Sequence, residues 1–296
     1  MTQNLMPNDT LHQKQFNDRM SDKDFSRLSA FIEKEYGIKL PPVKKTMLEG
    51  RIRKRLRHLG VDSFSQYCHL LFNSPNMENE FVQMVNVVTT NKTDFFREPN
   101  HFEYLVQTAL PGLTSSHRMI ERKPLIVWSA GCSSGDEPYT LAMVLADYFE
   151  TYSGPFIGFK IMATDISTHV LEKAMRGIYD GEKIGPIPLS FRKKYVLRNK
   201  NKDHNLFRIS PEIRAMIHFQ RLNLLDPDFG FREKIDVIFC RNVIIYFDRD
   251  TQGKVLGQMH RCLSPGGFLF LGHSETINGL NLPYIPVAPT IYKKER

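Results

Sequence analysis

Apolar residues recur at helical spacing through the first ninety positions of the chain. The first such segment begins after Ser21, a residue suited to capping a helix, and ends before Gly37. Its apolar positions are Phe25, Leu28, Phe31, Ile32 and Tyr36. A second segment, 42–59, ends before Gly60 and carries one apolar stripe. The stripe consists of Leu48, Ile52, Leu56 and Leu59. With further helical patterns over 63–72 and 77–87, we predict a small all-helical domain over 21–90, preceded by a mobile polar tail over 1–20.

Beyond residue 123, short apolar runs alternate with helical patterns. Strands are predicted over 125–130, 159–164, 235–240 and 268–272, and helices over 137–150, 167–176 and 251–262. This alternation is typical of a parallel sheet with helices on both faces. The rhythm breaks at 191–217, where FRKKYV and LFRIS are short β-like runs separated by polar residues. We therefore predict an α/β domain over 91–296 with a small β insertion, a hairpin, at about 191–217.

The composition is that of a globular protein, and it argues against membrane-spanning, disulfide-rich and zinc-binding classes. Hydrophobic residues make up 41% and charged residues 24% of the 296 positions. No apolar run approaches the roughly 20 residues that a membrane-spanning helix needs. The N-terminus shows no apolar leader, so we expect a cytoplasmic protein without membrane insertion. The four cysteines lack CxxC spacing, which argues against a disulfide framework and a zinc site. No metal site is predicted.

The formal net charge of +8 is concentrated in one predicted helix. Between residues 39 and 57 there are eight basic residues and a single acidic one, Glu49. Charge concentrated in this way indicates a docking surface for a particular acidic partner. The alternative is a merely solvated helix face, although such faces usually pair their bases with acids along the helix.

Two turns of the α/β domain have the features of a nucleoside-cofactor site. The turn AGCSSGDEPY (130–139) links a predicted strand to a helix, and its small residues let a ligand approach the backbone. Asp165 ends the next strand, where an acid can accept both ribose hydroxyls; the alternative is a cap for the following helix. Asp136 and Glu137 do not suit a pyrophosphate at this turn. They suit the positive sulfonium of S-adenosylmethionine.

Six motifs, in order along the chain, carry a family resemblance. They are NKTDFFRE (91–98), WSAGCSSGDEPYTLAM (128–143), ATDIS (163–167), RLNLL (221–225), FCRNVIIYFD (239–248) and LSPGGFLFLGHSE (263–275). Together they closely resemble the CheR chemotaxis receptor methyltransferases over about 22–294. The resemblance implies a Rossmann-like methyltransferase domain with a small inserted β subdomain, preceded by a small all-α domain. The implied activity is methyl transfer from S-adenosylmethionine to glutamate side chains of chemoreceptors, giving γ-methyl esters and S-adenosylhomocysteine.

The resemblance also implies the cofactor contacts, residue by residue. They are Asn91, Thr93, Arg97, Glu137, Asp165, Asn223, Leu224, Arg241 and Asn242. Asp165 is implied to hold the ribose, Asn223 and Leu224 to lie at the adenine, and Glu137 to lie near the amino end of the methionine moiety.

Arg97 and Tyr246 are implied to lie closest to the transferred methyl group. A glutamate carboxylate, with a pKa of about 4.3, is already ionised at pH 7, so the reaction needs no general base. Catalysis then depends mainly on orientation and on removing water from the carboxylate. In these roles Arg97 holds a carboxylate, and Tyr246 fixes the attacking oxygen by a hydrogen bond. An interdomain ion pair for Arg97 and a core position for Tyr246 are the alternatives.

The same resemblance implies a partner for the basic helix, because the methylated segments of chemoreceptors are acidic coiled-coil helices. The residues expected to contact them are Lys45, Arg51, Arg53, Arg55 and Arg57. Some family members bind a receptor C-terminal pentapeptide through an insertion whose hairpin loop is rich in glycine. Here the loop, NKNKDHN (199–205), has no glycine, so we expect recognition without that tether.

Two other functions are compatible with the same cofactor fold. One is a non-catalytic signalling module that binds S-adenosylmethionine or S-adenosylhomocysteine. The other is a nucleic-acid methyltransferase, suggested by the net charge. The strand over 235–240 leads into Cys-Arg-Asn-Val, which lacks the Asn/Asp-Pro-Pro-Tyr signature of nucleic-acid amino-methyltransferases. We therefore expect an active enzyme that binds no nucleic acid and acts as a monomer.

Overall fold

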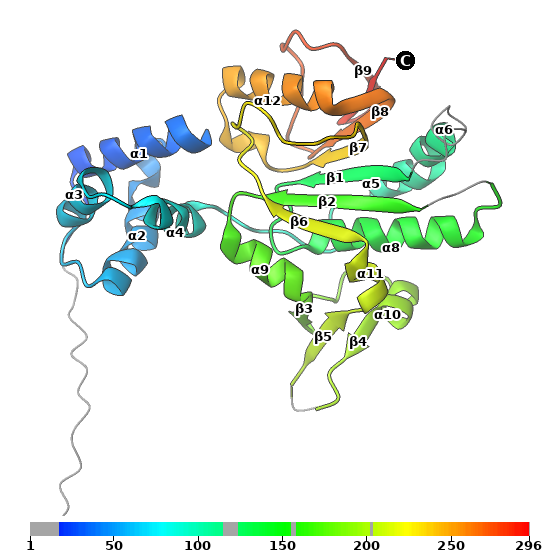
Figure 1. Cartoon of the computed structure of the whole chain (residues 1–296), viewed down its shortest axis with the longest axis horizontal. Helices are drawn as coiled ribbons and strands as arrows, with labels where there is room; N and C mark the ends of the chain where they lie inside the picture. The colour runs from blue at the N-terminus through cyan, green and yellow to red at the C-terminus, as the bar shows by residue number, and fades with distance from the viewer. Residues whose placement is uncertain (1–17, 115–123, 155–157, 202–203, 296) are drawn as a thin grey trace, which may run out of the picture.

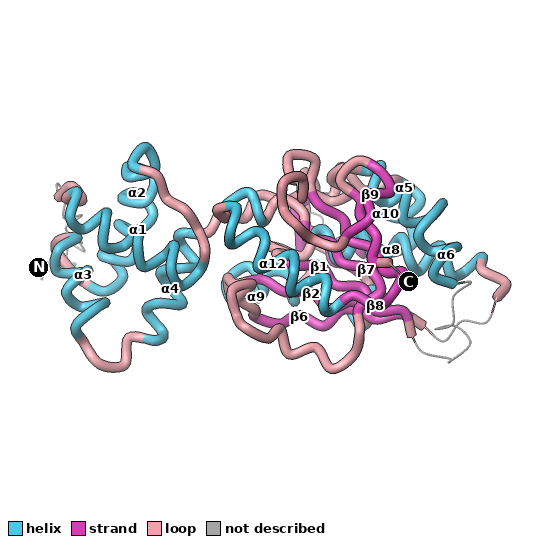
Figure 2. Tube along the Cα trace, turned by 90° about the horizontal axis from the view of Figure 1, so that it is seen from above, coloured by secondary structure: helices cyan, strands magenta, loops and turns pink. Residues whose placement is uncertain are grey.

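The computed structural model describes residues 18–114, 124–154, 158–201 and 204–295 of the chain. An all-helical part and a larger α/β part follow one another along the long axis of the molecule (Figures 1 and 2). Most of the expected mobile tail lies outside the described residues. Met20, which was assigned to that tail, is 1% exposed and packs into the helical core.

Four helices form the N-terminal part around a core of their own. They are α1 (Asp22–Tyr36), α2 (Lys45–Leu59), α3 (Phe64–Asn73) and α4 (Glu78–Val88), with a 3₁₀ turn at Pro42–Lys44. Ser21 caps α1 by accepting a hydrogen bond from the Asp24 N–H. Leu59 was expected in the buried stripe of α2 but is 37% exposed. The stripe ends at Leu56, because Gly60 turns the chain in a left-handed conformation directly after Leu59.

A seven-stranded sheet forms the centre of the α/β part, in the order β6-β2-β1-β7-β8-β10-β9. Its strands are β1 (Leu125–Ala130), β2 (Phe159–Asp165), β6 (Ile217–Arg221), β7 (Ile235–Cys240), β8 (Leu263–Leu271), β9 (Tyr284–Ala288) and β10 (Ile291–Lys294). The strands β6, β2, β1, β7 and β8 are parallel, β10 pairs antiparallel with β8, and β9 pairs antiparallel with β10 at the edge. The predicted parallel α/β architecture is confirmed. The sequence pattern missed β6, β9 and β10, which lie toward the two edges of the sheet.

Helices cover both faces of this sheet, as predicted. On one face lie α8 (Asp136–Thr151), α9 (Thr168–Arg176) and a helical segment made of α5 (Pro99–Tyr104), a π turn (Leu105–Ala109) and α6 (Leu110–Thr114). The opposite face is covered by α12 (Arg249–Cys262) (Figure 1). The sequence pattern did not predict the helical segment over 99–114. No helix within the described ranges combines the length and apolarity needed to cross a bilayer.

The insertion differs in detail from the predicted hairpin. It contains β3 (Ile178–Asp180), α10 (Leu189–Tyr195), β4 (Val196–Arg198), β5 (Leu206–Ile209) and α11 (Pro211–Ala215), with the strands in the antiparallel order β3-β5-β4. Most of FRKKYV is helical, since Phe191 and Tyr195 are one turn apart and stack on one face of α10. The prediction also missed β3 and placed the end of the insertion too late, because Ile217 already belongs to the main sheet. Residues 202–203 of its loop lie outside the described residues.

Candidate cofactor-binding site

A cavity opens where the helical part meets the carboxyl ends of β1, β2 and β7. All ten residues expected at the cofactor or the methyl group line it. They are Asn91, Thr93, Arg97, Glu137, Asp165, Asn223, Leu224, Arg241, Asn242 and Tyr246. The helical part adds Tyr36, Lys39, Lys44 and Met47 to the lining, which no local sequence signal indicated. The fold therefore gathers the expected residues around one space, and their contacts with a cofactor stay a prediction.

Asp165 lies at the tip of β2 and is only 7% exposed. Its Oδ2 accepts a hydrogen bond from the Ser133 N–H, and its Oδ1 accepts one from the Ser167 N–H, both at 2.9 Å. Burial raises the pKa of Asp165, and these backbone hydrogen bonds oppose the shift. The carboxylate thus holds the turn after β1 and the start of α9 together. Because each carboxylate oxygen has a second lone pair, it can still accept ribose hydroxyls.

The turn after β1 allows a ligand to approach its backbone closely. Gly131 has a φ of +73°, and a Cβ at this position would lie 2.4 Å from a methyl group of Val243. Only glycine therefore fits between β1 and the turn that follows β7. The open backbone here, together with Asp165 at the next strand end, fits an adenosyl group.

Glu137 and Arg241, which both line the cavity, form a buried ion pair. The Arg241 Nε donates to Glu137 Oε2 at 2.7 Å, and the Ser129 hydroxyl donates to Glu137 Oε1 at 2.7 Å. The Arg241 Nη1 also donates to the Arg97 carbonyl at 2.7 Å. The Arg241 side chain is 2% exposed, so these bonds form in a nearly water-free environment. One guanidinium thereby ties the end of β7 to the start of α8 and to the segment that carries Arg97.

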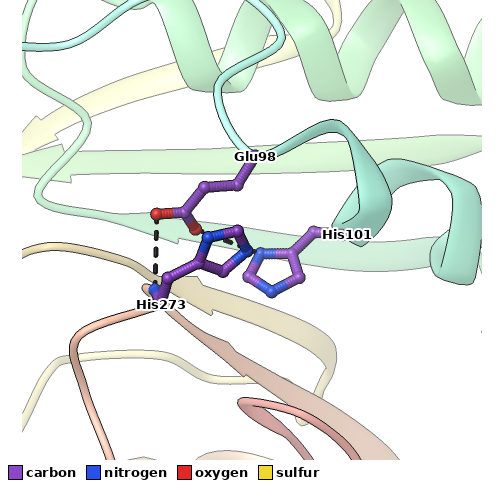
Figure 3. A group of neighbouring side chains, drawn as sticks. All are labelled: Glu98, His101 and His273. Atoms are coloured by element: carbon purple, nitrogen blue, oxygen red, sulfur yellow. Dashed lines mark hydrogen bonds and ion pairs between the residues drawn. The ribbon is translucent and has the colours of Figure 1, made fainter.

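Glu98, His101 and His273 meet beside this guanidinium (Figure 3), and their ligand atoms lie within 4.8 Å of one another. Such spacing is compatible with a metal ion. However, the Arg241 Nη1 lies 3.2 Å from His101 Nδ1 and 3.5 Å from Glu98 Oε2, so a positive charge is already present. Burial and the Arg241 charge lower the pKa of His101 to about 4. The cluster therefore suits a guanidinium better than a metal ion.

The bonding partners of His101 define its tautomer. Arginine can only donate, so His101 Nδ1 must be the acceptor and Nε2 carries the proton. Nε2 lies 3.0 Å from the Thr290 hydroxyl, which accepts that proton's hydrogen bond. His101 is thus a neutral, fully buried acceptor that fixes the Arg241 guanidinium.

Arg97 is held in an unusual stretch of backbone. Its neighbours Phe96 and Glu98 have φ values of +53° and +56°, a left-handed conformation that is uncommon for residues other than glycine. The Arg97 Nη1 donates to the Lys92 carbonyl at 3.3 Å. Within the described residues we find no carboxylate paired with Arg97, so the alternative of an interdomain ion pair is not observed.

Tyr246 follows β7 in a 3₁₀ turn, Ile244–Tyr246, and is half-buried at the cavity wall. Its carbonyl accepts a hydrogen bond from the Lys39 N–H at 3.0 Å, which joins the turn to the helical part. Because the residue is only half-buried and lines the cavity, its ring does not occupy the core position that was the alternative. Tyr246 and Arg97 lie on the same cavity.

Glu275 supports the turn after β7 and was assigned no role from the sequence. This carboxylate is 4% exposed. It accepts four backbone N–H groups, from Gly272 at 2.7 Å, Asn242 and Val243 at 2.8 Å, and Ile245 at 3.3 Å. Burial raises the pKa of Glu275, and the four hydrogen bonds oppose the shift. The sequence feature that could have indicated this role is the position of Glu275 as the last residue of the motif over 263–275.

The Asn223 side-chain amide forms hydrogen bonds within the protein. Its Nδ2 donates to the Glu35 carbonyl in the last turn of α1 at 2.7 Å, and its Oδ1 accepts from the Leu225 N–H at 3.1 Å. Asn223 therefore lines the cavity while it fastens the helical part to the α/β part. Leu224 beside it is 9% exposed and offers an apolar wall.

Two arginines of the basic helix α2 bind other residues of the helical part. Arg55 forms a two-pronged ion pair with Glu80, with N···O distances of 3.0 and 2.6 Å, and the Tyr67 hydroxyl donates to the same carboxylate. Arg51 donates to the carbonyls of Val88 and Thr89. Both arginines thus bind α4 and its C-terminal end, and the expectation that they also contact a partner stays a prediction.

The other expected contacts on α2 are more accessible. Lys45 pairs with the exposed Asp22, whereas Arg53 pairs with Glu49 in partly buried surroundings and also donates to the Asp18 carbonyl. Arg57 is exposed, as is Lys54, which was not among the expected contacts.

Comparison with known proteins gives two family matches and a set of relatives. Residues 23–89 match the family described as CheR methyltransferase, all-alpha domain, and residues 91–292 match CheR methyltransferase, SAM binding domain. A chemotaxis protein methyltransferase of Borreliella burgdorferi is 39% identical over 94% of this chain and 96% of its own length. Another, from Escherichia coli, is 37% identical over 92% of this chain and 91% of its own length.

Proposed function

The chain belongs to the CheR family of chemotaxis methyltransferases, and from this premise we propose that it methylates glutamate side chains of chemoreceptors to form γ-methyl esters. It is an S-adenosylmethionine-dependent enzyme that acts on chemoreceptors. The observation that carries the glutamate proposal is the charge on the cavity wall, because Lys39, Lys44, Lys92 and Arg97 are among the residues that line it. Four cations along the cavity suit an anionic acceptor side chain.

The residues of the cavity can perform this reaction without a general base. S-adenosylmethionine supplies an electrophilic methyl group on a positively charged sulfur. Asp165 would hold the ribose, and Glu137, which Arg241 fixes in place, would bind the amino end of the methionine moiety. Arg97 binds the acceptor carboxylate, and the Tyr246 hydroxyl donates a hydrogen bond to it. Because that carboxylate is already ionised, no residue has to remove a proton, and the rate gain comes from orientation and from excluding water.

The proposal is tested by the chemistry of the product. With radiolabelled S-adenosylmethionine and receptor-containing membranes, we expect label in the receptor that mild alkali releases as methanol, as an ester requires. Receptors in which the acceptor glutamates are changed to glutamine should remain unlabelled, and RNA or DNA offered in place of receptor should take up no label. Alkali-stable label would contradict an ester product and with it the glutamate assignment.

We further infer that the exposed cations of α2 dock the acidic methylation helices of the receptor. The support is the exposure and the positive charge of Lys54 and Arg57, in the C-terminal half of α2. We place the reaction in the cytoplasm and expect a monomer to carry it out.

Reversing the charge at Lys54 and Arg57 together, to glutamate, is expected to raise KM for the receptor roughly tenfold, because two attractive contacts become repulsive. The affinity for S-adenosylhomocysteine should stay unchanged, and the loss should shrink at high salt. A matched control reverses Lys160 and Arg232, which are exposed near the amino ends of β2 and β7. Steady-state methylation kinetics with all three proteins are the measurement, and equal KM values would refute docking on α2.

A further inference from the structure

Two neighbouring acids at the start of α8 are each paired with a cation from a distant part of the chain. Glu137 is paired with Arg241, at the end of β7. Asp136, which is 0% exposed, has its Oδ1 2.9 Å from the Nζ of Lys183. Lys183 lies in the insertion, between β3 and α10. The two pairs thus connect the start of α8 to two separate elements.

Each of these cations also binds the segment 91–98, which links the helical part to the α/β part. Arg241 donates to the Arg97 carbonyl at 2.7 Å, near one end of this segment. Lys183 donates to the Thr93 carbonyl and lies 3.1 Å from Asp94 Oδ1, near the other end. The segment is therefore fastened to α8 at two points. Thr93 and Arg97, whose carbonyls accept these bonds, line the cavity, as does Asn91 at the start of the segment.

Three oxygens surround the Lys183 ammonium. It donates hydrogen bonds to the Thr93 carbonyl and to Asp94 Oδ1, and it forms an ion pair with Asp136 Oδ1. Ordering a long lysine side chain costs conformational entropy, which a single exposed contact rarely offsets. Three contacts, one of them to a fully buried carboxylate, hold the ammonium in one place. Because Lys183 is not among the residues that line the cavity, it acts on the cavity through Thr93 and Asp136.

We propose that Lys183 is a positioning residue of the cofactor site, through which the insertion holds the segment 91–94 against the start of α8. Without its ammonium, the buried Asp136 carboxylate loses its charge partner, and the Thr93 carbonyl loses a donor. The segment can then move away from α8, and the wall formed by Asn91 and Thr93 loses its fixed position. The proposal rests on the assignment of the cavity to S-adenosylmethionine.

The experiment compares Lys183→Met with Lys194→Met by isothermal titration with S-adenosylhomocysteine. Lys194 is the matched control, since it also belongs to the insertion and pairs with α8, but at the other end, through Asp147 and Glu150. We expect Kd to rise about tenfold for Lys183→Met, the equivalent of one lost hydrogen bond to a charged group. For Lys194→Met we expect no change. In methylation kinetics, Lys183→Met should raise KM for S-adenosylmethionine by a larger factor than it lowers kcat.

Different results of this experiment would overturn the role of Lys183 and the assignment of the cavity to S-adenosylmethionine. Wild-type affinity in Lys183→Met overturns it, and so does an equal loss in both variants, which would indicate general packing of the insertion. Should Lys183→Met fail to fold, Lys183→Arg keeps a charged donor, and its Kd should lie closer to the wild-type value than that of Lys183→Gln. The reverse order would overturn the proposal. A wild-type protein that does not bind S-adenosylhomocysteine would instead refute the cofactor assignment.

Discussion

Asp165→Ala is expected to abolish measurable binding of S-adenosylhomocysteine. The carboxylate is implied to accept both ribose hydroxyls, and a hydrogen bond to a charged group contributes about 1.5–3 kcal/mol. Losing two of them predicts a rise in Kd of at least about 100-fold. The same change also frees the Ser133 and Ser167 N–H groups that shape the site. Isothermal titration of wild type and variant measures the effect directly.

Asp165→Asn is the control that separates ligand contacts from local structure. Asparagine keeps the volume and one acceptor oxygen, but its NH₂ group faces an N–H donor where a carboxylate oxygen stood. We expect it to bind more weakly than wild type and more tightly than the alanine variant. Thermal melting without ligand shows whether the fold survives each change. If Asp165→Ala binds S-adenosylhomocysteine as well as wild type, the ribose assignment is wrong.

Arg241→Met is expected to give the largest loss of stability. The methionine side chain is similar in length, but it leaves the buried Glu137 carboxylate without its cation and the Arg97 carbonyl without its donor. Breaking a buried ion pair from one side costs about 3–5 kcal/mol. For a chain of this size, that loss corresponds to a decrease in Tm of about 10 °C. Circular dichroism during thermal unfolding, without ligand, measures it.

A second substitution tests whether the unpaired charge is the cause. In the double variant Arg241→Met with Glu137→Gln, the buried carboxylate is removed together with its partner, so part of the lost Tm should return. Arg249→Met is the matched control, because this arginine is exposed and bonds to surface carbonyls at Thr276 and Asn278. It should change Tm by no more than about 2 °C. A drop in the double variant as large as in Arg241→Met would show that lost packing, rather than charge, destabilises the protein.

The insertion shows where a local pattern becomes ambiguous. FRKKYV places Phe191 and Tyr195 four residues apart, which fits one face of a helix, while its aromatic content also favours a strand. Packing decides between them, since both rings stack together on α10. Strand β3 is only three residues long and exists because β5 pairs with it. Elements this short gain their stability from neighbours, so their own residues carry little signal.

The basic helix illustrates the same limit for the site. Charge and spacing alone do not distinguish Arg51, Arg53, Arg55 and Arg57, because they do not show which residues lie opposite each side chain. In the structure, Arg55 meets the buried Glu80 from α4, twenty-five positions away. A residue that the spacing assigns to a partner surface thus stabilises the helical core.

By itself, the sequence determined the all-helical part, the parallel α/β sheet, the family and the residues that gather at the cavity. These features are encoded locally, in hydrophobic periods and in motifs that each occupy one strand end or turn. Only the tertiary structure decided that Lys183 and Arg241 fasten one segment to two buried acids, that Glu275 holds the turn before Tyr246, and that the helical part closes the cavity. Those decisions depend on ion pairs and hydrogen bonds between residues far apart in the chain. Their energy is set by distance and burial in the folded state, which spacing along a sequence does not record.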